Sequence, residues 1–239
     1  MISLPSIRLF IEHALSENAE IELDRKQAHY LTGVMRCKSG DLVRLFDGKA
    51  GEFLAQLQGT KKSFALVVQH KIKDLERNEG PTLFFAPLKK SAQDLLVEKA
   101  TELDVAVLQP ILTQRTINHR VNQERMYTIA REAAEQCERT MLPLIKEPIK
   151  IQTIESTLES ISHLFVGDER RDSDAPKLGD CKRRPSSCGI LIGPEGGFTP
   201  AEFSSLSGLP QTEFISLGQR ILRAETAAIA ALAVIGQWR

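Results

Sequence analysis

The segment GILIGPEGGFTPAE at residues 189–202 is the most informative part of the sequence for the fold. It begins with an apolar run typical of a buried strand and continues into a loop in which three of the five residues 193–197 are glycine. It ends where Thr199 is expected to cap a helix that carries Pro200 at its first position. A buried strand that leads through a short loop into a helix is the building unit of an α/β domain.

The same alternation of strand and helix extends on both sides of this stretch. We expect further strands at 82–86, 105–108, 164–167 and 213–217, and helices at 91–104, 121–139, 151–160, 200–207 and 223–238. This alternation predicts a mostly parallel sheet covered by helices on both faces, with ligands bound at the carboxyl ends of its strands. Residues 170–187 are polar and lack periodicity, and we expect a mobile surface loop there.

The first 73 residues follow a different pattern. Short runs of strand-forming residues separated by turn signals predict a small β-barrel, interrupted by one helix at about 25–36. A charged run and the turn formers Asn78-Glu79-Gly80-Pro81 then break the pattern. The sequence therefore predicts a β-barrel domain at residues 1–73, a linker at 74–81 and an α/β domain at 82–239.

Composition and motif content exclude several classes of protein. No apolar stretch approaches the roughly 20 residues needed to cross a bilayer, so no membrane partner is expected. The chain starts without the features of a secretory signal and has only four cysteines, which indicates a reducing cytoplasm. The cysteine and histidine spacings match no metal-binding pattern, and no metal site is expected. Walker A, G-x-G-x-x-G and G-x-S-x-G motifs are also missing.

The charge of the chain favours a polyanion partner only locally. Thirty-one basic and 31 acidic residues give a net charge of zero. Residues 36–73 nevertheless carry eight basic and three acidic side chains. This excess fits either a solvated strand surface or a patch that contacts RNA phosphates.

Two strand ends are candidates for a ligand site. The glycines of residues 193–197 let the backbone approach a ligand closely. A neutral or zwitterionic nucleoside fits this loop better than phosphate, because the loop has no lysine and Pro194 lacks an amide donor; a tight turn without a ligand is the alternative. The strand end at 217–222 leads into a helix that is apolar on nearly every face. That helix must be buried on more than one side, either within the monomer or against a second subunit.

The motifs GPEGGF at 193–198 and LGQRILRAETA at 217–227 closely resemble the SPOUT superfamily and, within it, the ribosomal RNA small subunit methyltransferase E family. The likeness extends to IRLF at 7–10, HYL at 29–31, KATEL at 99–103 and EAAEQCER at 132–139. The resemblance implies an N-terminal PUA-like β-barrel, a C-terminal α/β domain tied in a deep trefoil knot, and a homodimer. It also implies methylation of N3 of a uridine in 16S ribosomal RNA, in the small ribosomal subunit, with S-adenosylmethionine as the methyl donor.

In this family the cofactor binds between loops that follow three strands. Carried onto this sequence, the cofactor-binding residues are Val166, Gly167, Gly193, Glu195, Gly196, Gly197, Leu217, Gly218 and Leu222. This chain has Gly167-Asp168 where the family pattern has a more apolar residue and proline, and Met35 where leucine is usual.

Methylation of N3 requires an unstacked base that is losing its N3 proton, a group that stabilises charge on the uracil oxygens, and a proton acceptor. Arg223 or Arg220 is the expected cationic group, and Glu225 is expected either to accept the proton or to hold Arg223 in place. The expected RNA contacts are Arg8, Arg36, Arg115, Gln136 and Arg139. The alternatives for these side chains are surface ion pairs and an internal hydrogen-bond network.

Two other functions are compatible with the residues alone. A nonenzymatic RNA-binding protein, composed of the barrel and an inert α/β domain, would need the basic residues but neither glycine loop. An α/β enzyme for a phosphorylated metabolite would bind inorganic phosphate or a nucleoside triphosphate at the Gly193 loop.

Overall fold

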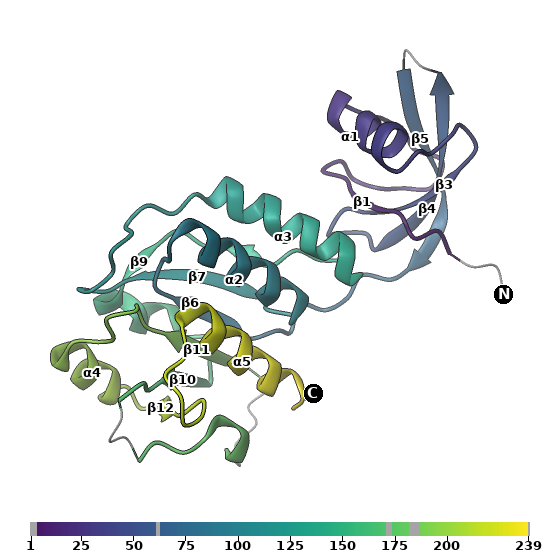
Figure 1. Ribbon diagram of the computed structural model, residues 1–239. Coiled ribbons are helices and arrows are strands. Elements are labelled where there is room, and N and C mark those ends of the chain that lie inside the picture. Colours follow the sequence, from purple (N-terminus) through teal and green to yellow (C-terminus); the bar gives the residue numbers. More distant parts are fainter. Residues whose placement is uncertain (1–3, 61–62, 171–173, 182–186, 239) are drawn as a thin grey trace. The chain divides into compact units, whose positions relative to one another are not determined.

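The computed structural model describes residues 4–60, 63–170, 174–181 and 187–238 (Figure 1). Its contacts divide the chain into two compact units. The first comprises Met1–Arg77 and Ala134–Leu142, and the second comprises Asn78–Ala133 and Pro143–Arg239. The sequence placed residues 134–142 with the second domain, whereas their contacts belong to the first unit. In the described residues, no helix combines the length and the apolar character needed to cross a membrane.

The first unit is built on a five-stranded sheet. In order across the sheet, its strands are β1 (Arg8–Phe10), β3 (Leu42–Phe46), β4 (Glu52–Thr60), β5 (Ser63–Lys73) and β2 (Glu20–Glu22). β1 is parallel to β3, and the other neighbours are antiparallel. Leu45, Leu57 and Leu66 are fully buried in the core of this unit. Closure of the sheet into a barrel stays a prediction.

The helix expected at 25–36 changes its hydrogen bonding along its length. α1 (Arg25–His29) begins with a capping box between Asp24 and Gln27. From Tyr30 to Val34 the chain continues as a π-helical turn. Arg36 then adopts a φ of 57°, which takes the chain out of the helix.

Arg8 binds residues 134–142 to the sheet of the first unit. Its Nε donates to Oε1 of Glu52 at 2.6 Å, and its Nη1 and Nη2 donate to the carbonyl oxygens of Ala134 and Arg139 at 2.6 and 2.9 Å. The side chains of Arg8 and Glu52 are 1% and 2% exposed. Arg139 is also buried. The predicted RNA contacts at Arg8 and Arg139 are therefore wrong, because protein atoms enclose both side chains.

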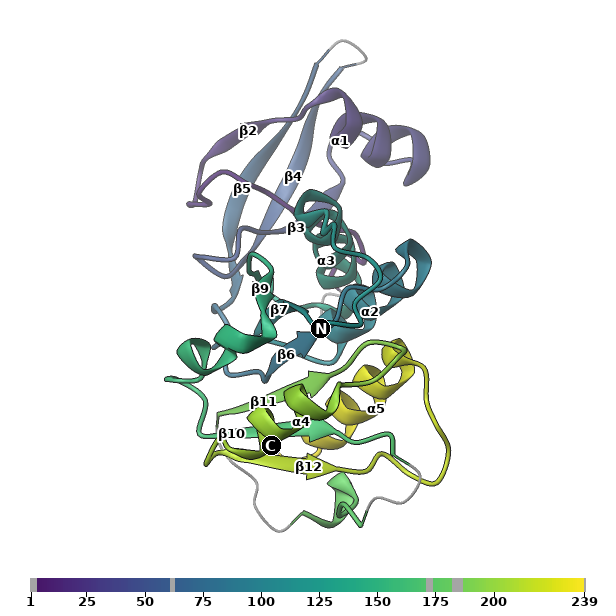
Figure 2. The same ribbon diagram turned by 90° about the vertical axis from the view of Figure 1, so that its left-hand side faces the viewer.

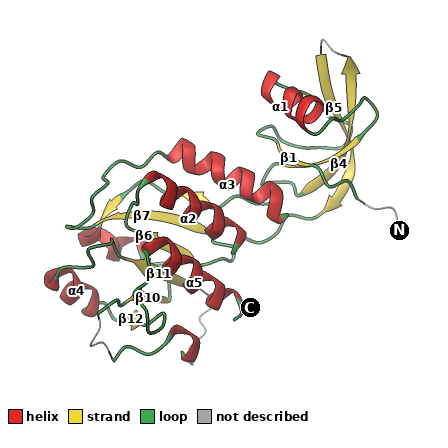
Figure 3. Ribbon diagram, in the orientation of Figure 1, coloured by secondary structure: helices red, strands yellow, loops and turns green. Residues whose placement is uncertain are grey.

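The second unit contains a seven-stranded sheet in its described residues, and all of the recorded strand pairs are parallel, which confirms the predicted α/β class. In order, its strands are β12 (Thr212–Ile215), β10 (His163–Gly167), β11 (Cys188–Ile192), β6 (Thr82–Phe85), β7 (Val107–Leu112) and β8 (Leu144–Ile145), and β9 (Ile149–Lys150) also pairs with β7. The α-helices after β6 are α2 (Lys90–Glu102), α3 (Gln123–Cys137), α4 (Pro200–Ser207) and α5 (Ala224–Gly236) (Figure 3). The helix expected at 151–160 is a 3-10 helix, Ile151–Thr157.

Hydrophobic cores cover both faces of this sheet. Successive residues of a strand point to opposite faces, so one strand contributes side chains to both cores. On β6, Leu83 and Phe85 belong to the core formed with α2, α3 and α5, whereas Phe84 belongs to the core formed with the 3-10 helix and α4. α5 contacts both α2 and β11, so part of its apolar surface is buried within the monomer. The covered faces leave the ends of the strands for ligand binding. The trefoil knot stays a prediction.

The described part of residues 170–187 is anchored to the sheet. Lys177 forms an isolated bridge with Ser216, and the N–H of Leu178 donates to the carbonyl oxygen of Ser216 at 3.0 Å. The side chain of Leu178 is buried in the same core as α5. The expected mobile loop is therefore wrong for residues 174–181. Residues 171–173 and 182–186 lie outside the described residues.

Candidate active site

Three neighbouring strands of the second unit end on the same side of the sheet. β10, β11 and β12 are parallel, and their carboxyl ends lie together in Figure 2. The segments that follow them, including residues 167–170, 193–198 and 216–223, line an open cavity of 1430 Å³. The cavity lies where parallel α/β sheets bind ligands.

The backbone requires glycine in two of these segments. Gly197 has a φ of 68° and Gly218 a φ of 122°, a region that residues with side chains rarely adopt. The N–H of Gly197 donates to the carbonyl oxygen of Pro194 at 2.8 Å, which closes a turn. At Gly193, a Cβ would lie 3.0 Å from the ring of Phe198. At these glycines the cavity wall is therefore main chain.

Thr199 and Glu202 fix the start of α4 at the predicted position. Oγ1 of Thr199 accepts from the N–H of Glu202 at 3.3 Å, and Oε2 of Glu202 accepts from the N–H of Thr199 at 2.8 Å. These bonds form a capping box, with Pro200 at the first helical position. Glu202 is buried, and its other oxygen, Oε1, accepts from the N–H of Gln114 at 2.8 Å. One carboxylate therefore joins the segment after β7 to the start of α4.

Arg115 lines the cavity next to residues 193–197, called the glycine loop. Its Nη1 donates to the carbonyl oxygen of Gly196 at 2.7 Å. Its predicted role was an RNA contact. Glu202, which positions the neighbouring Gln114, was not among the predicted site residues. The T-x-x-E pattern at 199–202 is a local signal for its capping bonds, but its bond to Gln114 spans 88 positions and has no local signal.

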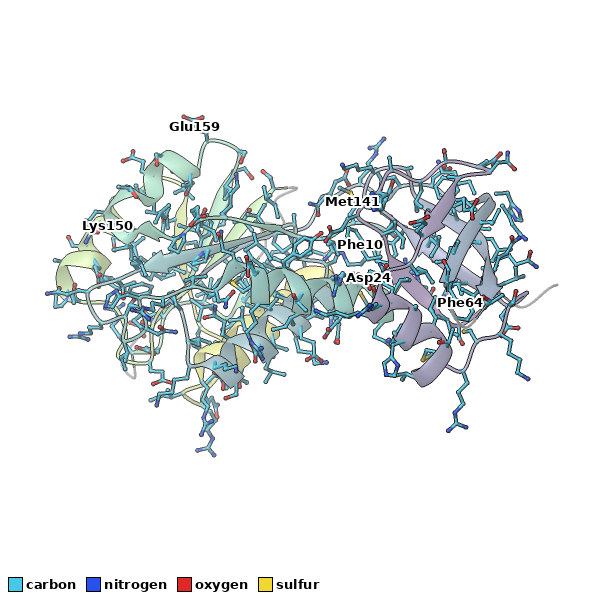
Figure 4. The ribbon with its side chains drawn as sticks, turned by 90° about the horizontal axis from the view of Figure 1, so that it is seen from above. Phe10, Asp24, Phe64, Met141, Lys150 and Glu159 are labelled. Carbon is cyan, nitrogen blue, oxygen red and sulfur yellow. The ribbon has the colours of Figure 1, made fainter. Side chains whose placement is uncertain are left out.

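Replacing Glu202 with alanine is expected to lower the free energy of unfolding by about 1–3 kcal/mol, because the buried N–H of Thr199 and the part-buried N–H of Gln114 lose their acceptor. Urea unfolding measures this loss. The matched control is Glu159→Ala, since Glu159 is exposed and projects from the surface of the second unit (Figure 4). Equal stability of the two variants would contradict the joining role of Glu202.

An ion pair and stacked rings hold the segment after β10. Asp168 accepts hydrogen bonds from Nε and Nη2 of Arg170 at 2.9 and 2.7 Å. The guanidinium of Arg170 lies 3.8 Å from the ring centroid of Phe203, and that ring stacks on Phe214 with centroids 4.1 Å apart. Asp168 belongs to the first loop that the family resemblance assigned to the cofactor, whereas Arg170 was not a predicted site residue. Together these contacts link the segment to α4 and β12.

Most of the predicted cofactor-binding and catalytic residues line the cavity: Gly167, Gly193, Glu195, Gly196, Gly197, Leu217, Gly218, Arg220, Leu222, Arg223 and Glu225. The prediction that Val166 contacts the cofactor is corrected. Its side chain is fully buried with Leu191 in the core on one face of the sheet. The predicted RNA contacts Arg36 and Gln136 are exposed in the first unit. Within the described residues, no group of His, Cys, Asp and Glu side chains could hold a metal ion.

The basic excess of residues 36–73 is partly neutralised within the first unit. Arg44, Lys71 and Lys73 each form an ion pair with a carboxylate, at 2.6, 2.8 and 2.5 Å. Lys61 and Lys62 lie outside the described residues. Ion pairs on the strands thus account for part of the basic excess, and a contact with RNA phosphates stays a prediction for the rest.

Comparison with known proteins covers both units. A family model described as an RNA methyltransferase domain matches residues 76–236, and one described as an RNA methyltransferase PUA domain matches residues 23–69. A ribosomal RNA small subunit methyltransferase E from Rickettsia conorii is 34% identical over 230 residues, which are 95% of this chain and 94% of the relative.

Two solved structures resemble the whole chain. A ribosomal RNA small subunit methyltransferase E from Neisseria gonorrhoeae, bound to S-adenosyl methionine, has a TM-score of 0.82 and 27% identity, covering 97% of this chain and 96% of the other. A putative methyltransferase from Legionella pneumophila, in complex with the cofactor SAM, has a TM-score of 0.83 and 26% identity, covering 97% of both chains. On these matches, the chain belongs to the ribosomal RNA small subunit methyltransferase E family.

Proposed function

We propose that the protein transfers a methyl group from S-adenosylmethionine to N3 of a uridine in the 16S ribosomal RNA of the small subunit. The observation that carries this proposal is the single cavity lined by glycine-containing segments after β10, β11 and β12. Membership of the family supports the type of reaction. The names of the relatives support small-subunit ribosomal RNA as the substrate.

The cavity fits the proposed cofactor in its shape and its chemistry. A Cβ at Gly218 would meet no atom within 4 Å, and one at Gly196 would meet only the side chain of Arg115, at 3.5 Å. Side chains at these positions would therefore occupy the space left for a ligand. Leu217 and Leu222 add apolar surface that suits an adenine ring. When bound, the cofactor supplies an electrophilic methyl group on a sulfonium.

Two arginines of the segment after β12, residues 216–223, are proposed to act on the uracil. Arg220 and Arg223 line the cavity, and Arg223 is the N-cap residue of α5. A guanidinium at this place stabilises the negative charge that grows on the uracil oxygens as N3 loses its proton. Glu225 is in the first turn of α5, where the helix dipole favours a carboxylate. We assign Glu225 the role of holding Arg223.

The first unit is proposed to bind RNA, which is supported by its match to the PUA domain model. Arg36 and Gln136 are exposed there and suit contacts to phosphate and sugar.

We also propose a homodimer, in which the partner covers the half-buried residues Ile229 and Ala233 of α5. A ribosomal RNA substrate would locate the protein in the cytoplasm.

Two measurements test the proposed function. Calorimetric titration with S-adenosylmethionine is expected to show binding, and inorganic phosphate is expected not to compete. An inert α/β domain would show no binding, and competition by phosphate would favour an enzyme for a phosphorylated metabolite.

Mapping of modified bases in 16S ribosomal RNA from cells that lack the protein is expected to show the loss of one N3-methyluridine, which the purified protein restores. An unchanged pattern of methylation would contradict the proposal.

A further inference from the structure

The cavity contains a carboxylate that was not among the predicted catalytic residues. Glu169 follows Asp168 in the segment after β10 and lines the cavity. A Cβ at Gly197 would lie 2.1 Å from Oε1 of Glu169, so the carboxylate occupies the space that any other residue at 197 would fill. Within the described residues, no group donates a hydrogen bond to Glu169, whereas both oxygens of Asp168 accept from Arg170. Glu169 is thus the acid of this segment that is free to act on a ligand.

A cation lies against the same glycine segment. Nη1 of Arg115 donates to the carbonyl oxygen of Gly196 at 2.7 Å, and Glu169 lies against Gly197. A guanidinium and a carboxylate therefore contact neighbouring glycines, and both side chains line the same cavity.

The surroundings of Glu169 favour its role as a proton acceptor. Burial, and then repulsion from Asp168, raise the pKa of Glu169 above its ordinary value, and the positive charge of Arg115 opposes the rise. A carboxylate with a raised pKa binds a proton more readily than an exposed one. It must still be ionised to act, so its contribution as a base is lost as the pH falls through that pKa.

We propose that Glu169 accepts the N3 proton of the target uracil while Arg115 donates to an adjacent uracil oxygen. This inference rests on the proposed function. Glu169 takes the proton, the electron pair left on N3 forms the new N–C bond, and the electrons of the broken S–C bond stay on sulfur as a neutral thioether. Negative charge therefore passes from the carboxylate to the uracil and is cancelled by the loss of the sulfonium charge.

The same pair of side chains accounts for the choice of base. The pairing edge of uracil has a donor, N3–H, between two carbonyl acceptors, which complements a carboxylate next to a guanidinium. Cytosine has an unprotonated N3, whose lone pair would face the Glu169 carboxylate. A site built to accept a hydrogen bond from its substrate strongly rejects an analogue without the donor. Glu169 would therefore select uridine as well as deprotonate it.

The test compares Glu169→Gln with the wild-type protein. The variant is expected to lower kcat by about 100-fold or more, the usual effect of losing a general base, with an unchanged melting temperature. Its dissociation constant for S-adenosylmethionine, measured by calorimetry, is expected to stay within about twofold, because glutamine keeps the size of the side chain. Glu169→Asp is expected to recover part of kcat. Glu159→Gln, at an exposed position, is the matched control.

A second readout does not need turnover. In the cofactor-free protein labelled with carbon-13 at the glutamate carboxyls, the resonance that disappears in Glu169→Gln is expected to titrate above the ordinary glutamate pKa. Arg115→Gln is expected to raise the pKa of Glu169 further, because a positive charge is removed. The wild-type kcat is expected to fall as the pH drops through this pKa, and the Glu169→Gln variant is expected to lack that dependence.

The possible failures are distinguishable. If the wild-type protein forms no N3-methyluridine in unmodified 16S ribosomal RNA, the proposed function fails. If the wild-type protein forms it and Glu169→Gln does so at the same rate, only the role of Glu169 fails. A large loss of cofactor affinity in Glu169→Gln, with full turnover at saturation, would also overturn the inference, since it would make Glu169 a cofactor-binding residue.

Discussion

Replacing Arg223 with alanine is expected to lower kcat by about 100-fold or more, the usual effect of removing one group that stabilises charge in a transition state. The affinity for S-adenosylmethionine is expected to stay nearly unchanged, because the proposed cofactor contacts lie in the glycine-containing segments and not at the side chain of Arg223. α5 is expected to remain intact, since the side chain of Arg223 makes no capping hydrogen bond at its start. Single-turnover kinetics and calorimetry measure the two quantities separately.

Arg120→Ala is the matched control for this experiment. Arg120 is an exposed arginine of the same unit and does not line the cavity. Its replacement is expected to leave both kcat and cofactor affinity unchanged. Weakened cofactor binding in Arg223→Ala, with full turnover at saturation, would count against the proposed role of Arg223.

Replacing Glu52 with alanine is expected to destabilise the first unit by about 3–5 kcal/mol, the usual cost of leaving a buried charge without its partner. The guanidinium of Arg8 is enclosed with Glu52, and the guanidinium of Arg44 lies 3.7 Å from the same carboxylate oxygen. Removal of Glu52 thus leaves the buried charge of Arg8 without an acidic partner, whereas Arg44 keeps its ion pair with Glu138. Chemical denaturation monitored by circular dichroism measures the loss.

Two further variants test whether the burial of the charges causes the loss of stability in Glu52→Ala. Glu102→Ala removes a carboxylate from the exposed pair of Lys99 and Glu102, and a loss below about 1 kcal/mol is expected there. Replacing Arg8 with methionine in the Glu52→Ala background is expected to recover part of the stability, because the uncompensated buried charge is removed as well. A loss in Glu52→Ala no larger than that in Glu102→Ala would refute the explanation.

The start of α4 shows how local signals predict structure. Thr199, Pro200 and Glu202 satisfy the requirements of a helix start within four consecutive residues, and the observed helix begins at Pro200. The 3-10 helix Ile151–Thr157 has no comparable cap at its N-terminus, and there the expected element was mistaken in type. Predictions succeeded where the residues that determine an element are neighbours along the chain.

Charged side chains show the opposite case. In the sequence, Arg8 and Arg139 are compatible with RNA contacts, but burial among segments distant along the chain makes them part of the first unit. Arg115 was also assigned to RNA, and its carbonyl partner is 81 positions away in the glycine loop. The sequence of an arginine and its neighbours does not indicate which distant segment will enclose it.

The α/β class, the parallel sheet and the glycine loops are predictable from the amino-acid sequence, because periodicity, capping and the backbone freedom of glycine act over a few residues. Three contacts became visible only in the folded chain: Glu202 joins two segments, Glu52 holds a buried arginine, and Glu169 lies against Gly197. The exposure and the proton affinity of a side chain depend on what surrounds it in space. Those surroundings come from strands that are neighbours in the sheet but distant along the chain.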